Sequence, residues 1–376
     1  MFKKKFQLGF LGGGVNSTIG NIHNIASKLD SRWILASGFF SRDKTVNLES
    51  ARSYGVSLER TYYSLENFIK NEKKRIDAVA VLVPTPARYK YILKLLKNNI
   101  PIISEKPLVD NFNQCINLQK ILTKDNFLRV TYNYVGYPLI RELKCMIDKN
   151  YFGRIKQIHF EIPQDAFTFN TSKKINPKKW RLKDGYIPNV SHDLGSHLLS
   201  LSSYLLREFP NKVMCNYFQS SQFKNLIDNG YFWLNFKSGI KGTFWISKSI
   251  PGIRNGLRLR IFGDKKGSEW LQTKPEELNI YNESGSIEKI DNLTFKLESY
   301  KKKYSRYKVG HPAGFLEAFA NLYYDYADQL DSFYNYKEKS FNQKKVIFDI
   351  KNSVYISKFF NAATKSNKTN KWIKVI

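Results

Sequence analysis

An aspartate and a histidine four residues apart are the first feature of this sequence that could do chemistry. They lie in SHDLGSHLL, residues 191–199, where Asp193 and His197 would share one face of a helix. A carboxylate beside an imidazole can orient the ring and raise its pKa, which suits a general base. The spacing also fits a helix start that Asp193 caps, with His197 only packed in a core. The pair alone leaves both interpretations open.

A lysine in SEKPLVDN, residues 104–111, is the second candidate. Lys106 follows a predicted strand, and Pro107 restricts its backbone to an extended form. An ammonium group at that position can donate to a substrate hydroxyl and stabilise a developing alkoxide. Glu-Lys-Pro is also a common surface tripeptide, so the interpretation depends on the fold around it.

GFLGGGVNSTIGNIH, residues 9–23, looks like a phosphate-binding turn with irregular spacing. In a GxGxxG pattern counted from Gly12, Ser17 takes the place of the third glycine, and the next glycine is Gly20. The turn lies between a predicted strand and a predicted helix, where backbone N–H groups can face a pyrophosphate. We therefore expect a lengthened dinucleotide turn in which Gly20 lets the helix pack closely on the sheet. The residues expected to face the phosphates are Gly12, Gly14, Asn16, Ser17, Thr18 and Ile19.

The end of the second predicted strand bears on the choice of cofactor. NAD sites usually carry an acidic residue there, which binds the ribose hydroxyls. Here Phe40 is followed by Ser41 and Arg42, and the Arg42 guanidinium could pair with a 2′-phosphate. Alternatively, Arg42 is a surface side chain paired with Asp43. The sequence predicts NAD(P)(H) as the cofactor, with a lean to NADP.

The elements that must position these residues alternate in type over the first third of the chain. Helices are predicted at residues 19–29, 45–54, 65–73, 86–97 and 112–122. Strands are predicted at residues 6–11, 33–39, 78–83, 100–104 and 127–131. The continuous apolar run AVAVLV at residues 78–83 is typical of a buried parallel strand. The fold class is therefore α/β, with a Rossmann domain, a doubly wound parallel sheet, over residues 1–130.

The pattern changes after about residue 130. Helices are predicted at residues 137–149, 194–206, 312–333 and 344–358, and a polar segment at residues 364–371. Strands are predicted at residues 155–162, 213–219, 231–236, 242–247, 257–262 and 268–272. Many of these strands alternate in polarity or carry aromatic residues, as half-buried antiparallel strands do. We expect a C-terminal α+β domain over residues 131–376, built on a mostly antiparallel open sheet.

Composition excludes several classes of protein. The 376 residues suffice for two domains with a large core. An apolar stretch of about 18 residues is missing, so we expect no membrane span. Cys115, Cys145 and Cys215 are far apart, which predicts neither a disulfide framework nor a zinc site and suits the cytoplasm. We expect no metal ion.

The net charge of +29 raises nucleic-acid binding as a rival function. The lysines are spread along the whole chain, and the short runs at residues 73–75 and 301–303 fit solvated faces. A genome rich in lysine codons explains the charge as well, and we expect no specific nucleic-acid partner. A positive field could still attract an anionic cofactor or a sugar phosphate.

In their order along the chain, the glycine turn, Glu105-Lys106-Pro107 and the Asp193–His197 pair resemble the Gfo/Idh/MocA family. This is the glucose–fructose oxidoreductase and inositol dehydrogenase type of NAD(P)-dependent enzyme. The resemblance runs from about residue 6 to residue 328. NYVGYPLI at residues 133–140 and GHPAGFLEAFANLY at residues 310–323 are similar to a sugar and inositol dehydrogenase branch, in which the longer glycine turn is familiar.

The resemblance implies oxidation of a secondary alcohol of a sugar, polyol or nucleotide sugar, or the reverse reaction. Lys106, Asp193 and His197 match the family's catalytic trio. His197 would accept the hydroxyl proton, Lys106 would stabilise the alkoxide and Asp193 would orient them, while the hydride goes to nicotinamide C4. The family also implies a second domain whose open sheet covers the nicotinamide and often forms the oligomer interface. We therefore expect a homodimer or homotetramer.

Two departures from the family affect the expected site. Residues 83–88 read VPTPAR, so Arg88 stands where relatives often have histidine, and paired glycines are missing before Asp193. The further residues expected at the cofactor are Ser41, Arg42, Val83, Pro84, Thr85, Arg88, Glu105 and Lys106. The expected substrate contacts are Lys106, Tyr134, Gln164, Trp180, Arg181, His192, Asp193, His197 and His311, with Lys179 as a further candidate. A rival interpretation is a sensor or partner subunit of the same fold that has lost catalysis, against which the intact trio argues.

Overall fold

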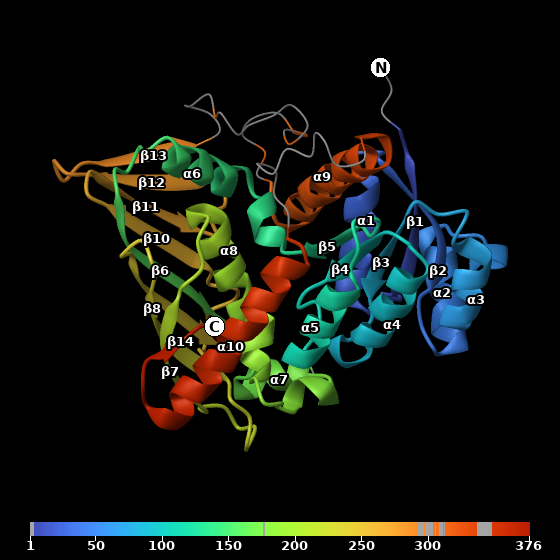
Figure 1. The fold of residues 1–376 in the computed structure, drawn as a ribbon, viewed down its shortest axis with the longest axis horizontal. Helices are drawn as coiled ribbons and strands as arrows, with labels where there is room; N and C mark the ends of the chain where they lie inside the picture. Colours follow the sequence, from blue (N-terminus) through green and yellow to red (C-terminus); the bar gives the residue numbers. More distant parts are fainter. Residues whose placement is uncertain are drawn as a thin grey trace. The chain divides into compact units, whose positions relative to one another are not determined.

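The computed structural model describes residues 4–175, 177–291, 297, 304, 306–307, 311, 313–336 and 348–376. The chain divides into two compact units, each labelled by element in Figure 1. The first unit is Met1–Gly136 with Gly314–Val354, and the second is Tyr137–Ala313 with Tyr355–Ile376. The chain passes from the first unit to the second after Gly136, near the boundary expected at residue 130. The return of residues 314–354 to the first unit was not expected.

The first unit is built on a parallel sheet, to which the described residues contribute five strands. They are β1 (Phe6–Gly12), β2 (Trp33–Phe39), β3 (Ala78–Leu82), β4 (Ile102–Glu105) and β5 (Leu128–Thr131). Their order is β2-β1-β3-β4-β5, and every neighbouring pair is parallel. β3 is buried at every position, as its apolar run predicted. The carboxyl ends of all these strands therefore meet at one edge, where the candidate site lies.

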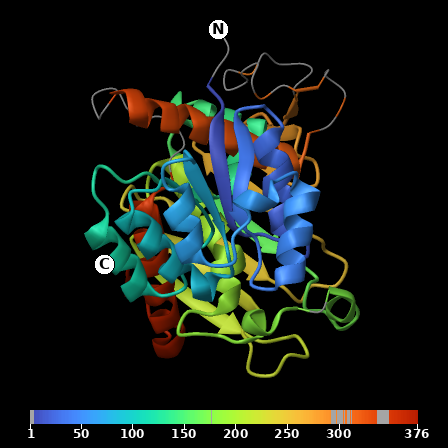
Figure 2. The same ribbon diagram turned by 90° about the vertical axis from the view of Figure 1, so that its right-hand side faces the viewer.

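Helices cover both faces of this sheet. They are α1 (Thr18–Lys28), α2 (Lys44–Tyr54), α3 (Leu65–Glu72), α4 (Thr85–Lys97), α5 (Phe112–Ile121) and α9 (Phe315–Tyr336). α1 and α9 lie side by side on one face, and α2 to α5 lie on the other (Figures 1 and 2). This arrangement confirms the predicted doubly wound Rossmann fold.

Contacts of α9 explain why a helix from late in the sequence belongs to the first unit. The indole Nε1 of Trp33 donates to the carbonyl of Tyr323 at 2.8 Å. Arg32 forms an ion pair with Asp328 at 2.6 Å. The sequence pattern predicted this helix but carried no sign of the sheet on which it packs. The start of the predicted helix at Pro312 lies outside the described residues.

The second unit holds a larger sheet, to which the described ranges contribute nine strands. They are β6 (Ile155–Pro163), β7 (Lys212–Phe218), β8 (Asn229–Asn235), β9 (Lys241–Ser247), β10 (Arg258–Gly263), β11 (Lys266–Leu271), β12 (Glu277–Asn282), β13 (Ile287–Asp291) and β14 (Ile373–Lys374). The order is β13-β12-β11-β10-β6-β9-β8-β7-β14. β6 and β9 are parallel and the other neighbours are antiparallel, which confirms the predicted mostly antiparallel sheet.

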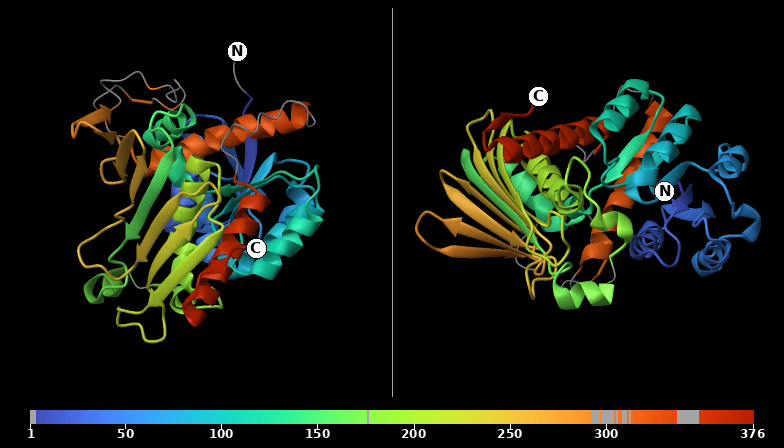
Figure 3. Two further views of the ribbon diagram at one scale, coloured as in Figure 1. Left: turned by 60° about the vertical axis from the view of Figure 1, so that its left-hand side comes forward. Right: turned by 90° about the horizontal axis from the view of Figure 1, so that it is seen from below.

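Helices of the second unit pack on one face of this sheet. α6 (Pro138–Asp148), α8 (Ser196–Leu206) and the C-terminal part of α10 (Ile350–Thr369) lie there, as Figure 3 shows. α7 (Phe169–Ile175) is a short helix between β6 and α8. On the opposite face, Tyr231 and Trp233 are 42% and 45% exposed. The second sheet is therefore open on one side, as expected.

α10 corrects one sequence prediction. Residues 364–371 were expected to form a polar segment, yet the helix continues to Thr369. Ser366 is fully buried and its hydroxyl accepts a hydrogen bond from the backbone N–H of Cys215 at 3.0 Å, so polar residues here face the sheet. Residues 344–347 of the predicted helix lie outside the described residues. None of the helices in the described ranges is long and apolar enough to cross a membrane.

Candidate functional site

β1 ends in a turn whose backbone requires glycine. Gly12 and Gly13 have φ values of +83° and +74°, which side chains other than glycine rarely adopt. A Cβ on Gly12 would lie 2.7 Å from the backbone nitrogen of Val83. The turn therefore packs directly against the end of β3, at the edge of the sheet where ligands bind in this fold class.

The first helix starts against the same turn. Ser17 caps α1, because its side chain accepts a hydrogen bond from the N–H of Gly20 at 3.3 Å. A Cβ on Gly20 would lie 2.1 Å from the carbonyl oxygen of Gly13, so only glycine allows this close approach, as expected. The N–H groups of the first helical turn and the helix dipole suit an anion. Asn16 and Thr18 are exposed beside them. These features fit the pyrophosphate of a dinucleotide.

Two side chains of α2 hold the turn in place. Ser50 accepts a hydrogen bond from the N–H of Val15 at 3.0 Å, and the Tyr54 hydroxyl donates to the carbonyl of Gly13 at 3.0 Å. Sequence analysis missed both residues, because no motif marks a serine and a tyrosine on a neighbouring helix. They restrict the conformation of the turn before any ligand binds.

The end of β2 carries the residues that bear on cofactor choice. The N–H groups of Phe40 and Ser41 both donate to Asn47 Oδ1, at 2.8 and 3.2 Å. Asp43 caps α2 by accepting from the N–H of Val46 at 3.0 Å. The carboxylate of Asp43 thus has a structural role, and the Arg42 side chain is exposed next to Ser41.

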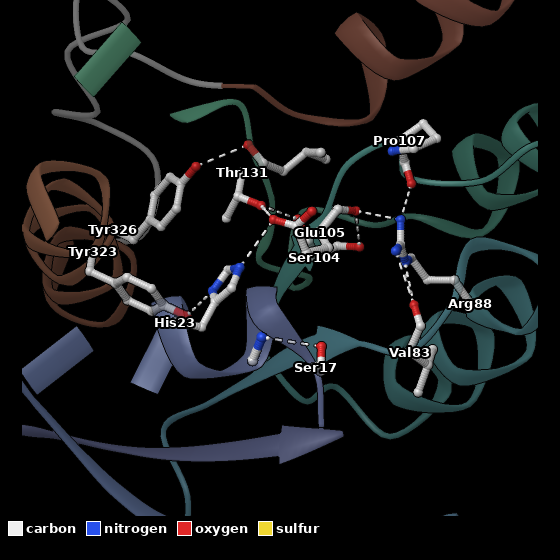
Figure 4. Close-up of polar contacts among 12 residues, drawn as sticks. Ser17, His23, Val83, Arg88, Ser104, Glu105, Pro107, Thr131, Tyr323 and Tyr326 are labelled. Atoms are coloured by element: carbon white, nitrogen blue, oxygen red, sulfur yellow. Dashed lines mark hydrogen bonds and ion pairs between the residues drawn. The ribbon is translucent and has the colours of Figure 1, made fainter. Parts of the chain in front are cut away.

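Lys106 directly follows β4 and is half-buried, and its peptide bond to Pro107 is cis. The preceding residue, Glu105, is buried in a polar network that Figure 4 shows. Glu105 Oε1 accepts a hydrogen bond from the Thr131 hydroxyl at 2.6 Å and lies 3.0 Å from His23 Nε2. His23 Nδ1 lies 2.7 Å from the Tyr323 hydroxyl. The network therefore connects β4, β5, α1 and α9.

The Glu105 carboxylate is held in its ionised form. Burial alone would raise its pKa, but the hydrogen bond from His23 and the positive charges of His23, Arg88 and Lys106 hold the pKa below its usual value. Sequence analysis expected Glu105 at the cofactor. The structure gives its side chain these partners within the protein, and a contact with the cofactor stays a prediction.

Arg88 binds backbone carbonyls on both sides of Lys106. Its guanidinium is 4% exposed and donates to the Val83 carbonyl through Nη2 and Nε, at 3.0 and 3.3 Å. Nη1 donates to the Glu105 carbonyl at 2.8 Å and also contacts the Pro107 carbonyl (Figure 4). The Arg88 side chain thus joins the ends of β3 and β4. Its expected contact with the cofactor stays a prediction.

Three further residues expected at the cofactor lie around the start of α4. Val83 and Thr85 are buried, and Pro84 between them is exposed. Because β3 is parallel to β1 and β4, these residues lie at the same edge of the sheet as the glycine turn and Lys106. The first unit thus brings most of the expected cofactor residues to one edge.

In the second unit, Asp193 lies in a π-helical turn, Ser191–Gly195, that continues into α8. Such wide turns occur frequently at functional sites. Asp193 Oδ2 forms ion pairs with Arg181 Nη1 at 2.8 Å and with Lys248 Nζ at 2.5 Å. His197 is buried in the first turn of α8. The two residues lie in one helical segment, as predicted, and two cations hold the carboxylate.

Lys248 is the residue that sequence analysis missed in this unit. It directly follows β9, and its side chain is 4% exposed. A lysine buried at the end of a strand needs an anionic partner, and Asp193 supplies one. No sequence signal distinguishes a lysine that follows a strand such as β9, because the burial of its side chain depends on the fold.

The expected substrate residues Trp180, Arg181 and Gln164 lie in two different segments of the second unit. Trp180 and Arg181 share a short 3₁₀ helix, Lys179–Leu182, and the Arg181 guanidinium lies 4.7 Å from the Trp180 ring centre. Gln164 is held by Asn255, which its side-chain amide contacts. Arg181 therefore joins Asp193 directly, whereas Gln164 is part of the loop after β6.

The remaining candidates are His192, His311 and Tyr134. His192 is buried in the π-helical turn, and His311 is exposed. Tyr134 is buried in the first unit, in a short 3₁₀ helix (Asn133–Gly136) after β5. Substrate contacts for these three residues stay predictions.

Two models of one oxidoreductase family match the chain, one after the other. Residues 8–134 match the model of an oxidoreductase family described as an NAD-binding Rossmann fold. Residues 144–375 match the model of the C-terminal alpha/beta domain of the same oxidoreductase family. A curated relative, the uncharacterised oxidoreductase YfiI of Bacillus subtilis, is 26% identical over 346 residues, which cover 88% of this chain and 87% of the relative.

Solved structures are similar along the whole chain. An inositol dehydrogenase homolog from Azotobacter vinelandii, in complex with NAD+, has a TM-score of 0.90 at 25% identity, and covers 99% of this chain and 97% of its own. An oxidoreductase from Sinorhizobium meliloti has a TM-score of 0.85 at 27% identity, and covers 99% of this chain and all of its own. With both domain models matched in order, the chain belongs to the Gfo/Idh/MocA family of oxidoreductases.

Proposed function

We propose that this protein transfers a hydride between a nicotinamide cofactor and a secondary alcohol or ketone of a sugar, polyol or nucleotide sugar. One observation carries the proposal: Lys106 and the glycine turn lie at the carboxyl edge of the same parallel sheet. The substrate class is supported by the Azotobacter vinelandii inositol dehydrogenase homolog, whose complex with NADH and myo-inositol is 25% identical to this chain.

Each proposed catalytic residue has a distinct task. The bound nicotinamide supplies the hydride acceptor or donor. Lys106 donates a hydrogen bond to the substrate oxygen and stabilises the negative charge that develops there. His197 accepts the hydroxyl proton. Asp193, which Arg181 and Lys248 hold as a carboxylate, orients the reacting groups.

For the cofactor, we propose Arg42 as the contact of a 2′-phosphate and hence a preference for NADP. The exposed Arg42 and the capping role of Asp43 support this. The relatives with a named cofactor hold NAD+ or NADH and do not support it. Arg42→Ala should weaken NADPH binding about tenfold and leave NADH binding unchanged, as measured by fluorescence titration. Equal affinities of the wild type for the two cofactors would contradict the preference.

Assembly and location are further parts of the proposal. We propose a homodimer or homotetramer that forms through the open face of the second sheet, with small molecules rather than nucleic acid as its other partners. The exposed Tyr231 and Trp233 on that face support an interface. We propose a cytoplasmic location because the three cysteines suit a reducing compartment.

The experiment that tests this function is a cofactor-dependent screen. Purified protein is assayed against polyols, aldoses and nucleotide sugars, with NAD and with NADP, by the absorbance of the reduced nicotinamide. We expect turnover with at least one compound of these classes. Cofactor binding without turnover of any compound would favour the rival, a sensor or partner subunit of the same fold.

A further inference from the structure

Lys106 is flanked by two buried groups that the proposed reaction does not use. Arg88 binds the backbone on both sides of it, and His23 faces the side chain of Glu105 before it. We propose that Arg88 and His23 are positioning residues that fix Lys106 and couple its position to the dinucleotide turn. The part of this inference that concerns turnover rests on the proposed function.

Two sets of contacts, which we call the Arg88 arm and the His23 arm, lead to Lys106. The Arg88 arm acts on the backbone. The carbonyls of Glu105 and Pro107 belong to the two residues that flank Lys106, and a single nitrogen of Arg88, Nη1, contacts both. The other end of the guanidinium binds the Val83 carbonyl. The planar fork of arginine can serve several acceptors at fixed angles, which the ammonium group of a lysine cannot do. Arg88 thus fixes the segment around Lys106 to the end of β3.

The end of β3 is itself part of the dinucleotide turn. Gly12 packs against the backbone of Val83 so closely that a Cβ there would lie 2.7 Å from the Val83 nitrogen. A shift of the turn must therefore shift Val83, and Arg88 transmits that shift to the carbonyls beside Lys106. The first arm runs from Gly12 through Val83 and Arg88 to Lys106.

The His23 arm acts on the side chain of Glu105. His23 is fully buried, and both ring nitrogens have partners, Glu105 on one side and Tyr323 on the other. Two partners fix the ring orientation, and the Thr131 hydroxyl fixes the carboxylate from a third direction. His23 lies on α1, whose first turn begins at the capping residue Ser17. The second arm therefore also starts at the dinucleotide turn, as Figure 4 shows.

Because both sets of contacts link Lys106 to the turn, we expect a dinucleotide bound at the turn to fix the position of Lys106 as well. A displacement of a reacting group by about 1 Å can cost about 100-fold in rate. We therefore expect loss of either arm to lower kcat while the dinucleotide itself still binds. A purely structural role would instead lower the yield of folded protein and leave kcat for each bound dinucleotide unchanged.

The first test compares Arg88→Lys with Arg32→Ala. Arg32 is the matched control, because it is 5% exposed in the same unit and its hydrogen bonds run to Asp328 and the Lys4 carbonyl. For Arg88→Lys we expect kcat, normalised to bound NADH, to fall about tenfold or more, with the dinucleotide Kd within about threefold of the wild type. Arg32→Ala should keep kcat. An unchanged kcat in Arg88→Lys would overturn the inference.

The second test does not need a substrate. Hydrogen exchange of the backbone amides in residues 104–110 is measured by mass spectrometry with and without NADH. In the wild type and in Arg32→Ala, NADH should slow this exchange, and in Arg88→Lys and His23→Asn the slowing should be lost. Retained slowing in both variants overturns the inference, even if the wild type oxidises no sugar or polyol and the proposed function has failed. If Arg88→Lys does not fold, Arg88→His takes its place.

Discussion

At the residue scale, Glu105 is a buried carboxylate that stays ionised in the folded protein. Burial alone would raise its pKa, yet the pKa is held below the ordinary value because His23, Arg88 and Lys106 stabilise the charged form. A carboxylate with a lowered pKa stabilises the folded state at neutral pH. That contribution is lost as the pH falls through the folded-state pKa, which lies below 4.5.

Replacement of Glu105 by glutamine tests whether the ionised carboxylate stabilises the folded protein. Glu105→Gln should lower the free energy of unfolding at pH 7 by roughly 2 kcal/mol, because it removes a charged hydrogen-bond acceptor. The difference from the wild type should shrink as the pH falls through the lowered pKa of Glu105, where the wild-type group takes up a proton. Urea unfolding at neutral and at acidic pH measures this difference. Glu66→Gln, at an exposed glutamate, is the control and should change little. A difference that stays constant in acid would contradict the account.

Residue identities at the site were predictable to different degrees. Lys106, Asp193 and His197 were proposed because three short motifs in this order resemble one family, although each motif alone left other interpretations open. Lys248 and Arg181 meet Asp193 only through the folding of the second unit, so the ion pairs could not be predicted. The partners of Arg88 were also hidden, because a buried arginine that binds carbonyls leaves no periodic pattern.

At the element scale, the contact between the glycine turn and α1 leaves no room for a side chain on Gly20. Gly20→Ala would bring a Cβ to 2.1 Å from the Gly13 carbonyl oxygen, and the backbone would have to move. We expect a loss of about 1–3 kcal/mol in stability and at least a tenfold loss in dinucleotide affinity. Thermal unfolding and NADH titration measure the two effects.

Gly314→Ala is the matched control for this prediction. Gly314 lies in the same unit, and a Cβ there would have its nearest neighbour at 3.9 Å, an ordinary contact distance. It should leave dinucleotide affinity unchanged. Wild-type affinity in Gly20→Ala would mean that α1 does not need its close approach to the turn.

Helices and strands were predicted well where the spacing of apolar residues was regular. The alternation of β1 to β5 with their helices gave the Rossmann sheet, since apolar runs and turn residues separate there cleanly. β12 and β13 were missed, because the sequences ELNIYN and IEKID are short and rich in polar or charged residues. The π-helical turn at Asp193 was also missed, since its extra residue per turn depends on packing and not on propensity.

At the scale of the whole molecule, the open face of the second sheet carries exposed aromatic side chains. Tyr231 stacks on Phe218 and Trp245 at ring distances of 5.7 and 6.1 Å, and Trp233 is exposed on the same face. Exposed aromatic patches of this kind mark interaction sites. Among the described residues no helix packs on this face, and the proposed occupant is a second copy of the chain.

Trp233→Glu should therefore shift the protein from oligomer to monomer at micromolar concentration, because a carboxylate would be buried in the interface. Sedimentation velocity measures the distribution of species. Leu58→Glu, at an apolar residue of the first unit with 48% exposure, is the control and should keep the wild-type mass. If Trp233→Glu sediments as the same oligomer as the wild type, the interface lies on another surface.

The charge of +29 also belongs to this scale, and it was the least informative sequence feature. Lysines spread over both units raise the potential around the molecule but indicate no partner. The fold and the motifs decided the family, whereas net charge alone favoured a class of protein for which no motif was found.

Hydride transfer that depends on Lys106 can be measured by isotope transfer from the substrate to the nicotinamide. The oxidisable sugar or polyol found in the screen is prepared with deuterium at the carbinol carbon, and the reduced nicotinamide is analysed by mass spectrometry. The account predicts deuterium in the nicotinamide with the wild type. With Lys106→Ala it predicts NADH binding but at least about 100-fold less labelled product. Equal labelling by the two proteins, or oxidation without deuterium in the nicotinamide, would contradict the claim.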